Sequence, residues 1–347
     1  MKFERIKKNP IIQISDIKPS AAGMEVIGVF NCGVAEYAGK IVLLLRVAER
    51  AISDERFARV PMFDAEKGEM VIRSFPKSDK DIDFSDVRFV KTKEQLFLTS
   101  ISHLRLAFSS DGVDFTIEDK PFMAAENEYE EFGVEDPRIT ELEGWYYINY
   151  SAISRAGVVT SLARTKDFLS VERMGIIFLA DNKDVVIFPQ KVGGRYCALH
   201  RPVSAYFQRP EMWISYSDNL TAYDGHKRLC RLREGHFDSA RLGASCVPFL
   251  TEKGWIEIYH GCDENDAYCL GALLLDKDSP EKIIARSELP LVFAEEEYEK
   301  KGFMPNVIFS CGLYRPGDVL NIYYGACDEC VCLGRITLQD VFESLGV

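Results

Sequence analysis

Carboxylates and a cation gather in residues 133–139 of the sequence. Glu135 and Asp136 stand side by side there, and Arg138 follows after Pro137. Neighbouring residues of an extended chain point to opposite faces, so we expect only one of the two carboxylates to face a reaction centre and the other to be structural. Asp136 precedes a proline, which favours extended or turn backbone. An equally simple interpretation is a turn carboxylate paired with Arg138.

Basic and aromatic side chains stand at the ends of three further apolar runs. Lys183 stands just before the run 185–188, and His200 and Arg201 end the run that begins at residue 196. His260 follows the run 255–259, and Tyr268 comes shortly after it. A lone residue of this kind is usually a surface residue or a satisfied core residue. Gathered around one mouth, such a group would hold an anion of phosphate size, with the arginine supplying bidentate contacts.

Residues 302–312 and 323–328 combine Asn, Asp and aromatic side chains. These types suit sugar hydroxyls and ring faces, although ordinary turn chemistry explains them as well. Other chemistries lack their motifs. The sequence has no Gly-x-Ser-x-Gly nucleophile elbow, no P-loop and no Gly-x-Gly-x-x-Gly, so neither a serine hydrolase nor a nucleotide site is indicated.

Three of the ten cysteines, Cys327, Cys330 and Cys332, form a cluster that invites a metal interpretation. A closed zinc or iron–sulfur site needs four ligands, and no second Cys pair or spaced His pair completes it. We therefore expect no metal. The cysteines are predicted to be reduced core thiols, with this cluster flanking a tight turn and alternate thiols packed inward along a strand.

Composition narrows the range of partners. The 347 residues carry 42 Lys+Arg against 54 Asp+Glu, a net charge of −12, which argues against a nucleic-acid partner. No apolar stretch precedes Pro10, and the longest aliphatic run, residues 41–45, is far shorter than a membrane span. We expect a cytoplasmic protein that does not contact a membrane.

Short runs rich in Val, Ile, Tyr and Phe dominate the sequence and are separated by Gly, Asp and Asn turns. The runs are residues 41–47, 96–100, 145–150, 158–163, 185–188, 196–200, 212–216, 255–259, 269–275 and 320–324. The clearest helical pattern is the tail, where Thr337 is placed to cap a short helix through residues 340–345. No linker divides the chain. We expect one all-β domain over residues 1–347 with a short C-terminal helix.

A weak internal repeat suggests the architecture. Ser/Thr–Asp turns recur after strand-like runs, with Asp111, Asp167, Asp218 and Asp278 at steps of 56, 51 and 60 residues. A recurrence of about fifty residues in a strand-only chain is typical of four-stranded propeller blades, and the chain accommodates roughly five of them. The alternative is a large β-sandwich with similar turns by chance.

Taken together, these motifs resemble those of glycoside hydrolase family 130, five-bladed propeller enzymes that act on β-mannosides. The resemblance covers nearly the whole chain. It rests on Val-Glu-Asp-Pro-Arg, Phe-Pro-Gln-Lys followed by His-Arg-Pro, Gly-Trp…Tyr-His-Gly, and Pro-Asn-Val…Tyr-Tyr-Gly-Ala-x-Asp. Most members of this kind are phosphorylases, which cleave a terminal β-mannosidic bond with inorganic phosphate and invert the sugar to α-mannose 1-phosphate.

The resemblance also implies roles for individual residues. Asp136 matches the family's general acid, which acts in some members through a substrate hydroxyl. The positions that ring the phosphate match Lys183, Arg201 and His260, with Tyr268 joining them and Arg105 as a further candidate. The positions that hold the mannosyl unit match Asn31, Arg46 and Asp328. Residues 51–100 form a longer segment than in many relatives, which blurs the placement of Arg105.

One carboxylate beside several cations agrees with this resemblance. An inverting glycosidase needs an acid and a separate carboxylate base with room for water, whereas phosphate is already an anionic nucleophile and needs only positioning. We therefore expect a β-mannoside phosphorylase, with β-1,2-linked manno-oligosaccharides favoured over β-1,4. Phosphate is a substrate, and no metal or organic cofactor is expected. The alternatives are an inverting β-mannosidase and a non-catalytic sugar-binding propeller. Relatives often self-associate, so a homo-oligomer is allowed.

Overall fold

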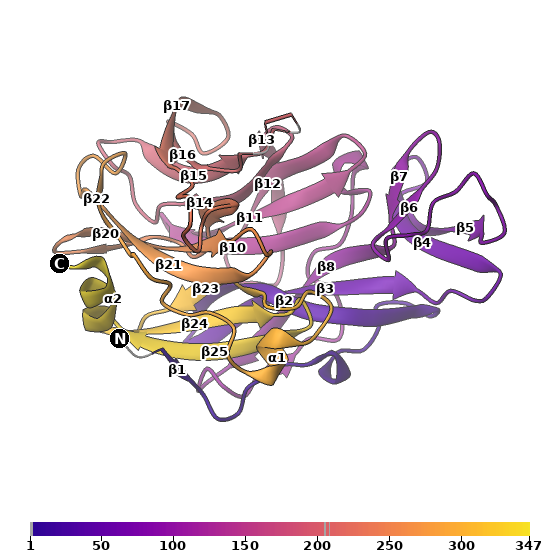
Figure 1. Ribbon diagram of the computed structural model, residues 1–347, viewed down its shortest axis with the longest axis horizontal. Coiled ribbons are helices and arrows are strands. Elements are labelled where there is room, and N and C mark those ends of the chain that lie inside the picture. Colours follow the sequence, from indigo (N-terminus) through magenta and orange to yellow (C-terminus); the bar gives the residue numbers. More distant parts are fainter. Residues whose placement is uncertain (1–2, 205, 208) are drawn as a thin grey trace.

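The computed structural model describes residues 3–204, 206–207 and 209–347. Five antiparallel sheets follow one another around a ring, which confirms the five-bladed propeller and shows the sandwich alternative to be wrong (Figure 1). Each sheet is one blade, and its first strand is the innermost. Most strands pair with the next along the chain, so each blade is a meander of hairpins.

The blades are numbered in chain order. Blade 1 holds β2 (Met24–Tyr37), β3 (Lys40–Ala51), β8 (Ser100–Ser109) and β9 (Thr116–Ile117). Blade 2 holds β10 (Val134–Leu142), β11 (Trp145–Ser154), β12 (Gly157–Thr165) and β13 (Glu172–Phe178). Blade 3 holds β14 (Asn182–Ile187), β15 (Tyr196–Pro202), β16 (Met212–Ser217) and β17 (Tyr223–Cys230).

The last two blades complete the ring. Blade 4 holds β18 (Arg241–Ala244), β20 (Gly254–Cys262), β21 (Tyr268–Leu275) and β22 (Ile283–Arg286), with β19 (Phe249–Thr251) paired to β20. Blade 5 holds β23 (Ile308–Tyr314), β24 (Val319–Ala326), β25 (Cys330–Thr337) and, as its outermost strand, β1 (Glu4–Arg5). The pairing of β1 with β25 ties the beginning of the chain to its end and closes the propeller.

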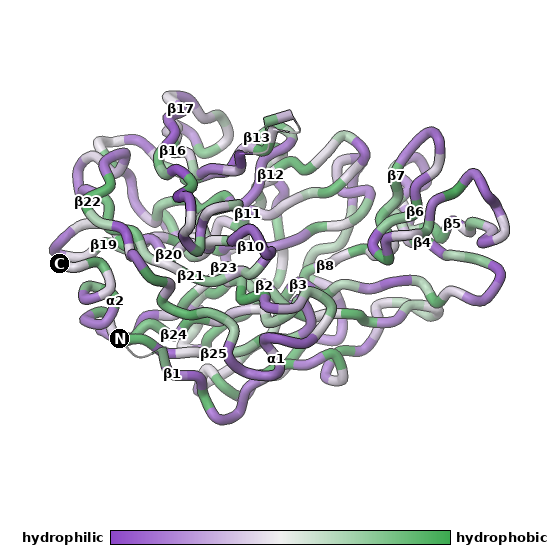
Figure 2. The backbone as a smooth tube through the Cα atoms, in the orientation of Figure 1, coloured by the Kyte–Doolittle hydropathy of each residue, from purple (hydrophilic) through white to green (hydrophobic). Residues whose placement is uncertain are grey.

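The core lies between the blades. Five apolar clusters each join two neighbouring blades; in one of them Leu44 of blade 1 packs with Ile148 of blade 2. A middle strand buried on both faces needs apolar residues in succession, which explains the aliphatic run in β3. In Figure 2 the hydrophobic colour concentrates along the strands, while many peripheral loops are hydrophilic.

The repeat marks the end of the third strand in each of the first four blades. After β8 the Ser109 hydroxyl accepts from the backbone N–H of Gly112 at 2.8 Å, and Thr165 after β12 does the same for Phe168 at 3.0 Å. The residue equivalent to Asp111 and Asp167 is Asn219 in blade 3 and Asp276 in blade 4, because their side-chain oxygens accept from the following backbone N–H groups. The marker Asp218 was therefore one residue early, and the marker Asp278 was two residues late.

The long segment between β3 and β8 forms two extra hairpins. They consist of β4 (Phe57–Asp64) with β5 (Glu69–Pro76), and β6 (Phe89–Lys91) with β7 (Leu96–Leu98), and they project from blade 1 at the right of Figure 1. The backbone N–H of Phe63 donates to the carbonyl of Glu131 at 2.8 Å, which attaches the first hairpin to the segment before blade 2.

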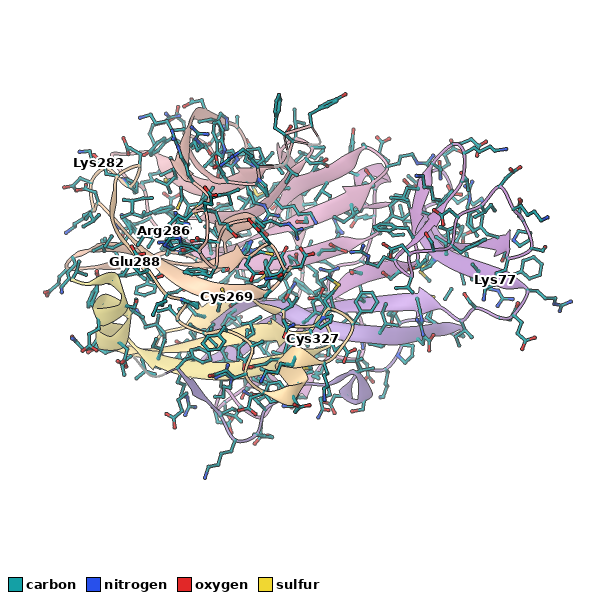
Figure 3. The ribbon with its side chains drawn as sticks, viewed as in Figure 1. Lys77, Cys269, Lys282, Arg286, Glu288 and Cys327 are labelled. Atoms are coloured by element: carbon teal, nitrogen blue, oxygen red, sulfur yellow. The ribbon has the colours of Figure 1, made fainter. Side chains whose placement is uncertain are left out.

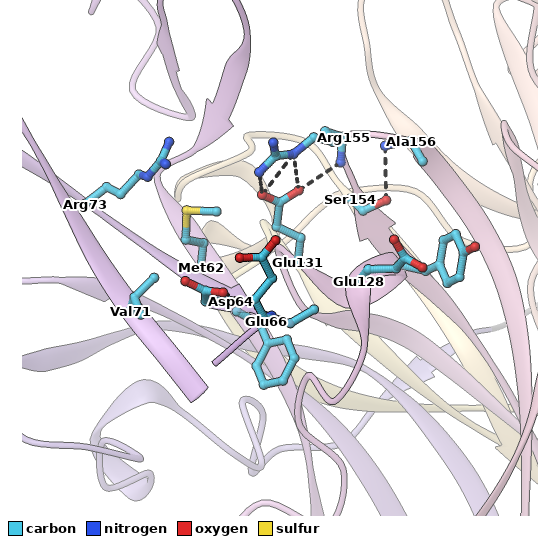
Figure 4. Close-up of a pocket in the computed structure, with 13 residues that line it drawn as sticks. Met62, Asp64, Glu66, Val71, Arg73, Glu128, Glu131, Ser154, Arg155 and Ala156 are labelled. Atoms are coloured by element: carbon cyan, nitrogen blue, oxygen red, sulfur yellow. Dashed lines mark hydrogen bonds and ion pairs between the residues drawn. The ribbon is translucent and has the colours of Figure 1, made fainter. Parts of the chain in front are cut away.

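A cleft of about 460 Å³ lies between this hairpin and blade 2 (Figure 4). Met62 and Arg73 line one side of it, and the ion pair of Glu131 with Arg155 lines the other. These residues belong to the inserted hairpin and to the loops of blade 2. The cleft is therefore beside the ring and not at its centre.

Helices are few and short. They are the 3-10 turns Ile14–Asp16 and Glu128–Glu130, α1 (Glu297–Lys300) and α2 (Leu338–Leu345). The side chain of Thr337 accepts from the backbone N–H of Asp340 at 3.0 Å, so the predicted cap and C-terminal helix are confirmed. No helix in the described part of the chain is long and apolar enough to cross a membrane.

All ten cysteine side chains are buried and free. Cys330 and Cys332 lie on β25 within the apolar cluster between blades 4 and 5, and Cys327 lies in the turn before it, as predicted. Figure 3 shows Cys269 and Cys327 in the interior, with Lys77 and Lys282 at the periphery. Within the described ranges no group of three His, Cys, Asp or Glu side chains is placed to hold a metal ion.

Candidate active site

The innermost strands of three consecutive blades share an irregularity at the same place. The strand register shifts around Asn31 on β2, Asp136 on β10 and Asp184 on β14. These residues have positive φ angles of 47°, 49° and 53°, a left-handed conformation that Asn and Asp tolerate better than most residues. A bulge re-aims a side chain, and here it brings polar groups of neighbouring blades together.

Asp136 is the centre of a first group. Its Oδ1 accepts from Nδ2 of Asn31 and from Nη1 of Arg46, each at 2.9 Å. Nη2 of Arg46 donates to Oε1 of Glu135 at 2.7 Å, and the same guanidinium lies over the ring of Phe30 at 4.6 Å. Two residues of blade 1 therefore hold the carboxylate of a residue on blade 2.

The expectation that Glu135 and Asp136 serve opposite faces was wrong, because both bind Arg46. The bulge between Glu135 and Arg138 breaks the alternation of side chains on which that expectation depended. The turn-pair interpretation was wrong as well. Arg138 donates to the backbone carbonyl of Asp136 at 2.9 Å, and its carboxylate partner is Asp184.

Asp328 completes the group that we call the Asp136 cluster: Asn31, Arg46, Glu135, Asp136 and Asp328. Burial raises the pKa of Asp328 to about 6, and the charges of Asp136 and Glu135 act in the same direction. Burial also works to raise the pKa of Asp136, but Arg46, Arg138 and the hydrogen bond from Asn31 outweigh it and hold that pKa below its ordinary value. Of the two aspartates, Asp328 is therefore the first to take up a proton as pH falls towards 6, while Asp136 stays ionised.

Asp184 is the centre of a second group. Nη1 of Arg201 lies 2.9 Å from its Oδ2, and Nη2 of Arg138 lies 3.3 Å from its Oδ1. Nε2 of His260 lies 3.4 Å from the same Oδ2 and 3.2 Å from Nη1 of Arg201. Burial opposes ionisation here too, but the basic groups, Arg201 first, lower the pKa of Asp184 to about 2.

Lys183 lies between the two groups. It precedes Asp184 on β14 and stands opposite Arg201 in the strand register. Its charge lowers the pKa of Asp184, and it acts on Asp136 and Asp328 in the same direction. A cation that reaches all three carboxylates lies at their junction.

His260 is fully buried on β20. Its ring lies 4.5 Å from that of Phe309 and 6.0 Å from that of Tyr268, and its Nδ1 lies 3.2 Å from Oγ of Ser245. Burial lowers the pKa of His260 to about 3, so the imidazole is neutral near pH 7. We call Arg138, Asp184, Arg201, Ser245 and His260 the Asp184 cluster.

Tyr268 borders this cluster, whereas Arg105 does not. The Tyr268 hydroxyl accepts from Nη1 of Arg241 at 2.7 Å. Arg105 is buried on β8, where its guanidinium donates to the carbonyl of Lys18 at 3.0 Å and contacts His103 at 3.1 Å. We therefore leave Arg105 out of the phosphate site proposed below.

The sequence assigned no role to Asp184 or Ser245, and it indicated Arg138 only as a partner of a turn carboxylate. Asp184 stands beside the predicted Lys183, and its likeness to Asp136 lies only in the bulge and the positive φ. Ser245 lies directly after β18, in a loop where the sequence shows no functional motif. Its neighbours come from other parts of the fold, so no local signal identified it.

Comparisons with known proteins bear on the site. A family of glycoside hydrolases, number 130, described as beta-1,4-mannooligosaccharide phosphorylase, matches residues 92–346. A beta-1,2-mannobiose phosphorylase of Listeria innocua is 42% identical over 352 residues, which cover 100% of this chain and 99% of that protein. A 1,2-beta-oligomannan phosphorylase of a Thermoanaerobacter species is 38% identical over 244 residues, 70% of this chain and 80% of that protein.

Solved structures agree. The Listeria innocua beta-1,2-mannobiose phosphorylase in complex with beta-1,2-mannobiose superposes with a TM-score of 0.96 at 41% identity, covering 100% of this chain and 99% of that one. A structure described among glycoside hydrolases of family 130 that target beta-1,2 mannosidic linkages gives a TM-score of 0.75 at 20% identity, covering 97% and 94%. The second likeness supports the fold alone.

Proposed function

Because the chain belongs to glycoside hydrolase family 130, we propose that it is an inverting β-mannoside phosphorylase. Its substrates are β-1,2-linked manno-oligosaccharides and inorganic phosphate, and its sugar product is α-mannose 1-phosphate. The observation that carries the proposal is the meeting of Lys183, Arg201 and His260 at Asp184, with Lys183 and His260 near enough to Asp136 to interact with its charge. Full-length similarity to a relative named for β-1,2-mannobiose supports the linkage.

The proposed reaction needs one displacement. A phosphate oxygen forms a bond to C1 of the terminal mannosyl unit while the bond from C1 to the glycosidic oxygen breaks, and a proton from Asp136 reaches the leaving oxygen directly or through a sugar hydroxyl. Arg201 and Lys183 hold the phosphate and reduce the cost of placing its charge beside the sugar. Asn31, Arg46 and Asp328 hold the mannosyl unit, and Tyr268 borders the phosphate.

The state of Asp136 suits the two directions of the reaction differently. Without sugar its carboxylate is ionised, since Arg46 and Asn31 bind it. An ionised carboxylate is the base that synthesis from mannose 1-phosphate requires. Phosphorolysis needs the acid form, so a sugar that draws Arg46 away from Asp136 raises the pKa of that carboxyl and prepares it to donate.

We also propose that the whole chain is one catalytic domain that uses no metal or organic cofactor. Its partners are then a β-mannosyl oligosaccharide and phosphate, with self-association open to measurement. The ten free, buried cysteines suit a reducing compartment, so we place the activity in the cytoplasm.

The test is product release from β-1,2- and β-1,4-linked mannosyl disaccharides with and without phosphate. Mannose 1-phosphate formed only with phosphate, and fastest from β-1,2-mannobiose, is the expected result. Free mannose released at a rate that does not depend on phosphate would refute the phosphorylase in favour of a hydrolase. The carboxylates that share Arg46 with Asp136 or lie near it, Glu135 and Asp328, would then be candidates for the base that activates water.

A further inference from the structure

Ser245 joins two members of the Asp184 cluster, Arg138 and His260, to the buried carboxyl of Glu257. It is fully buried, and all its polar groups have partners. Its backbone N–H donates to Oε1 of Glu257 at 3.0 Å, and its carbonyl accepts from Nε of Arg138 at 3.4 Å. Its hydroxyl lies 3.2 Å from Nδ1 of His260, the one side-chain contact that a change of side chain would remove.

A neutral imidazole has one donor and one acceptor, and the partner of one nitrogen decides which nitrogen carries the hydrogen. His260 is neutral because of its burial. To donate from Nε2 to a phosphate oxygen, the ring must leave Nδ1 as an acceptor, and Nδ1 then needs a buried donor. The Ser245 hydroxyl is the group in contact with it.

The surroundings of Nε2 favour the same arrangement. Oδ2 of Asp184 lies 3.4 Å away and, among the described residues, accepts no hydrogen bond, although it is paired by charge with Arg201. A hydrogen on Nε2 would supply that bond in the protein without phosphate, and the same hydrogen is the one that a bound phosphate oxygen would share or take over. Nη1 of Arg201, at 3.2 Å, favours the opposite tautomer, so the two alternatives differ in the direction of the Ser245–His260 hydrogen bond.

We propose that Ser245 is a positioning residue for phosphate, whose hydroxyl donates to Nδ1 of His260 and so keeps Nε2–H directed at the anion site. The inference rests on the proposed function in one respect, that the anion is phosphate. Ser245 touches neither substrate nor reacting atoms; it acts through His260. In the opposite tautomer Nδ1 carries the hydrogen and donates to Ser245, so the Nε2 lone pair faces the anion and repels it. Loss of the Ser245 hydroxyl would then free the ring from that tautomer and strengthen anion binding.

The sign of the effect of Ser245→Ala therefore decides the matter. The dissociation constant of inorganic phosphate, measured by calorimetric titration, is expected to rise roughly three- to tenfold, the equivalent of one neutral hydrogen bond. In turnover the KM for phosphate should rise by the same factor, while kcat at saturating phosphate and the KM for β-1,2-mannobiose stay within about twofold. An unchanged or lowered dissociation constant would overturn the proposal.

Three variants separate positioning from a structural effect. Ser215→Ala removes another fully buried serine hydroxyl, one with no hydrogen-bond partner among the described residues, and should leave phosphate binding unchanged. Ser245→Thr keeps the hydroxyl and should restore most of the affinity. If Thr does not fit, Ser245→Ala in a His260→Gln background gives the same answer. In that background Ser245→Ala should not raise the dissociation constant of phosphate any further. A rise as large as in the wild-type background would refute action through His260.

The binding measurement also keeps this inference separate from the proposed function. A wild type that binds phosphate but releases free mannose in the absence of phosphate would disprove the phosphorylase. The effect of Ser245→Ala on the dissociation constant of phosphate could still be measured. A wild type that forms mannose 1-phosphate with no change in Ser245→Ala would disprove only the positioning role. A wild type that binds no phosphate would disprove both.

Discussion

Asp136 on β10 and Asp184 on β14 occupy the same bulge of neighbouring blades, with φ angles of 49° and 53°. Both are buried, and both are bound by arginines that other strands supply. Their neighbours differ. Asp136 has further carboxylates nearby and one arginine bound to its side chain, whereas Asp184 lies between two arginines and a neutral histidine.

The consequence is a difference in how easily the cluster around each aspartate takes up a proton. The pKa of Asp184 is lowered to about 2, so this carboxylate stays ionised and holds Arg138 and Arg201 in place. The Asp136 cluster has more negative than positive groups, and one of its members, Asp328, has a pKa raised to about 6 by burial. The same backbone position therefore lies beside a carboxyl that exchanges its proton, Asp328, in one blade and is a fixed counter-ion in the next, because the neighbouring blades supply different side chains.

The largest expected effect is on catalysis by Asp136→Asn. The amide keeps the size of the side chain but donates no proton, so the rate of mannose 1-phosphate formation should fall about 10²- to 10⁴-fold. The melting temperature should fall less than in Asp184→Asn, because Glu135 stays bound to Arg46 and Asp328 lies nearby, so the arginine keeps a counter-ion. Retention of more than a tenth of the wild-type rate would contradict the role given to Asp136.

Asp184→Asn should show the opposite pattern, with stability as the main loss. Removing this charge leaves Arg138 and Arg201 buried without their shared counter-ion, and such losses amount to about 3 kcal/mol. The folded pKa lies below the unfolded value of about 3.9, so the stabilisation is fully present above that value and disappears as pH falls towards 2.

Urea unfolding of wild type and Asp184→Asn at pH 7 and pH 3 measures this difference. The gap between the two proteins should be largest at pH 7 and about half as large at pH 3. Asp136→Asn is the matched control, since it makes the same chemical change at the equivalent bulge. The contrast between the clusters would not stand if both variants lost equal stability at pH 7.

The fold was predictable where both faces of a strand are buried. The runs 145–150 and 255–259 lie within β11 and β20, second strands of their blades, because strands between two packed layers must be apolar throughout. The innermost strands β2, β10, β18 and β23 were not predicted. Two of them, β2 and β10, carry polar site residues, and in β2, β10 and β23 a register shift breaks the pattern, so neither alternation nor an apolar run marks these three.

The site was predictable only to the extent that the family resemblance placed its residues. Asn31, Arg46 and Asp136 do meet, although 105 positions separate the first from the last. Glu135 and Asp136 both bind Arg46, which the sequence could not predict, because the arrangement depends on the bulge in β10. Ser245 and Asp184 depend in the same way on how blades 2, 3 and 4 meet, which is information that no local pattern contains.

A smaller effect is expected for Asp328→Asn. Ionised Asp328 and Asp136 repel each other, so each raises the pKa of the other; the variant should hold the proton of Asp136 less firmly. At pH 7, above the pKa of about 6 for Asp328, kcat/KM for phosphorolysis should fall roughly three- to tenfold, about one pKa unit of coupling. Below pH 5 the ratio of variant to wild type should approach one, because Asp328 is then neutral in both.

Dividing the kcat/KM of the variant by that of the wild type at each pH removes the effect of phosphate ionisation, because that effect is the same for both proteins. A ratio that does not change between pH 5 and pH 8 would show that Asp328 acts only by holding the sugar. The proton-exchanging character of the Asp136 cluster would then have to reside in Asp136 alone.

Glu257→Gln should have the smallest effect and sharpens the comparison most directly, since Glu257 and Asp184 are both buried near Arg138. Burial raises the pKa of Glu257 well above its ordinary value, and only its Oε1 has a partner among the described residues.

The folded protein therefore binds the proton of Glu257 more tightly than the unfolded chain does, and its free energy of unfolding falls as pH rises above about 4.3. Glutamine keeps the bond from Ser245 and removes this fall, so the variant should be more stable than the wild type at pH 8 and match it at pH 4. Urea unfolding at both pH values tests this, and a destabilised variant at pH 8 would mean that Glu257 is ionised and paired like Asp184. Agreement would show that partners, and not depth, decide which buried carboxyl of this propeller is charged.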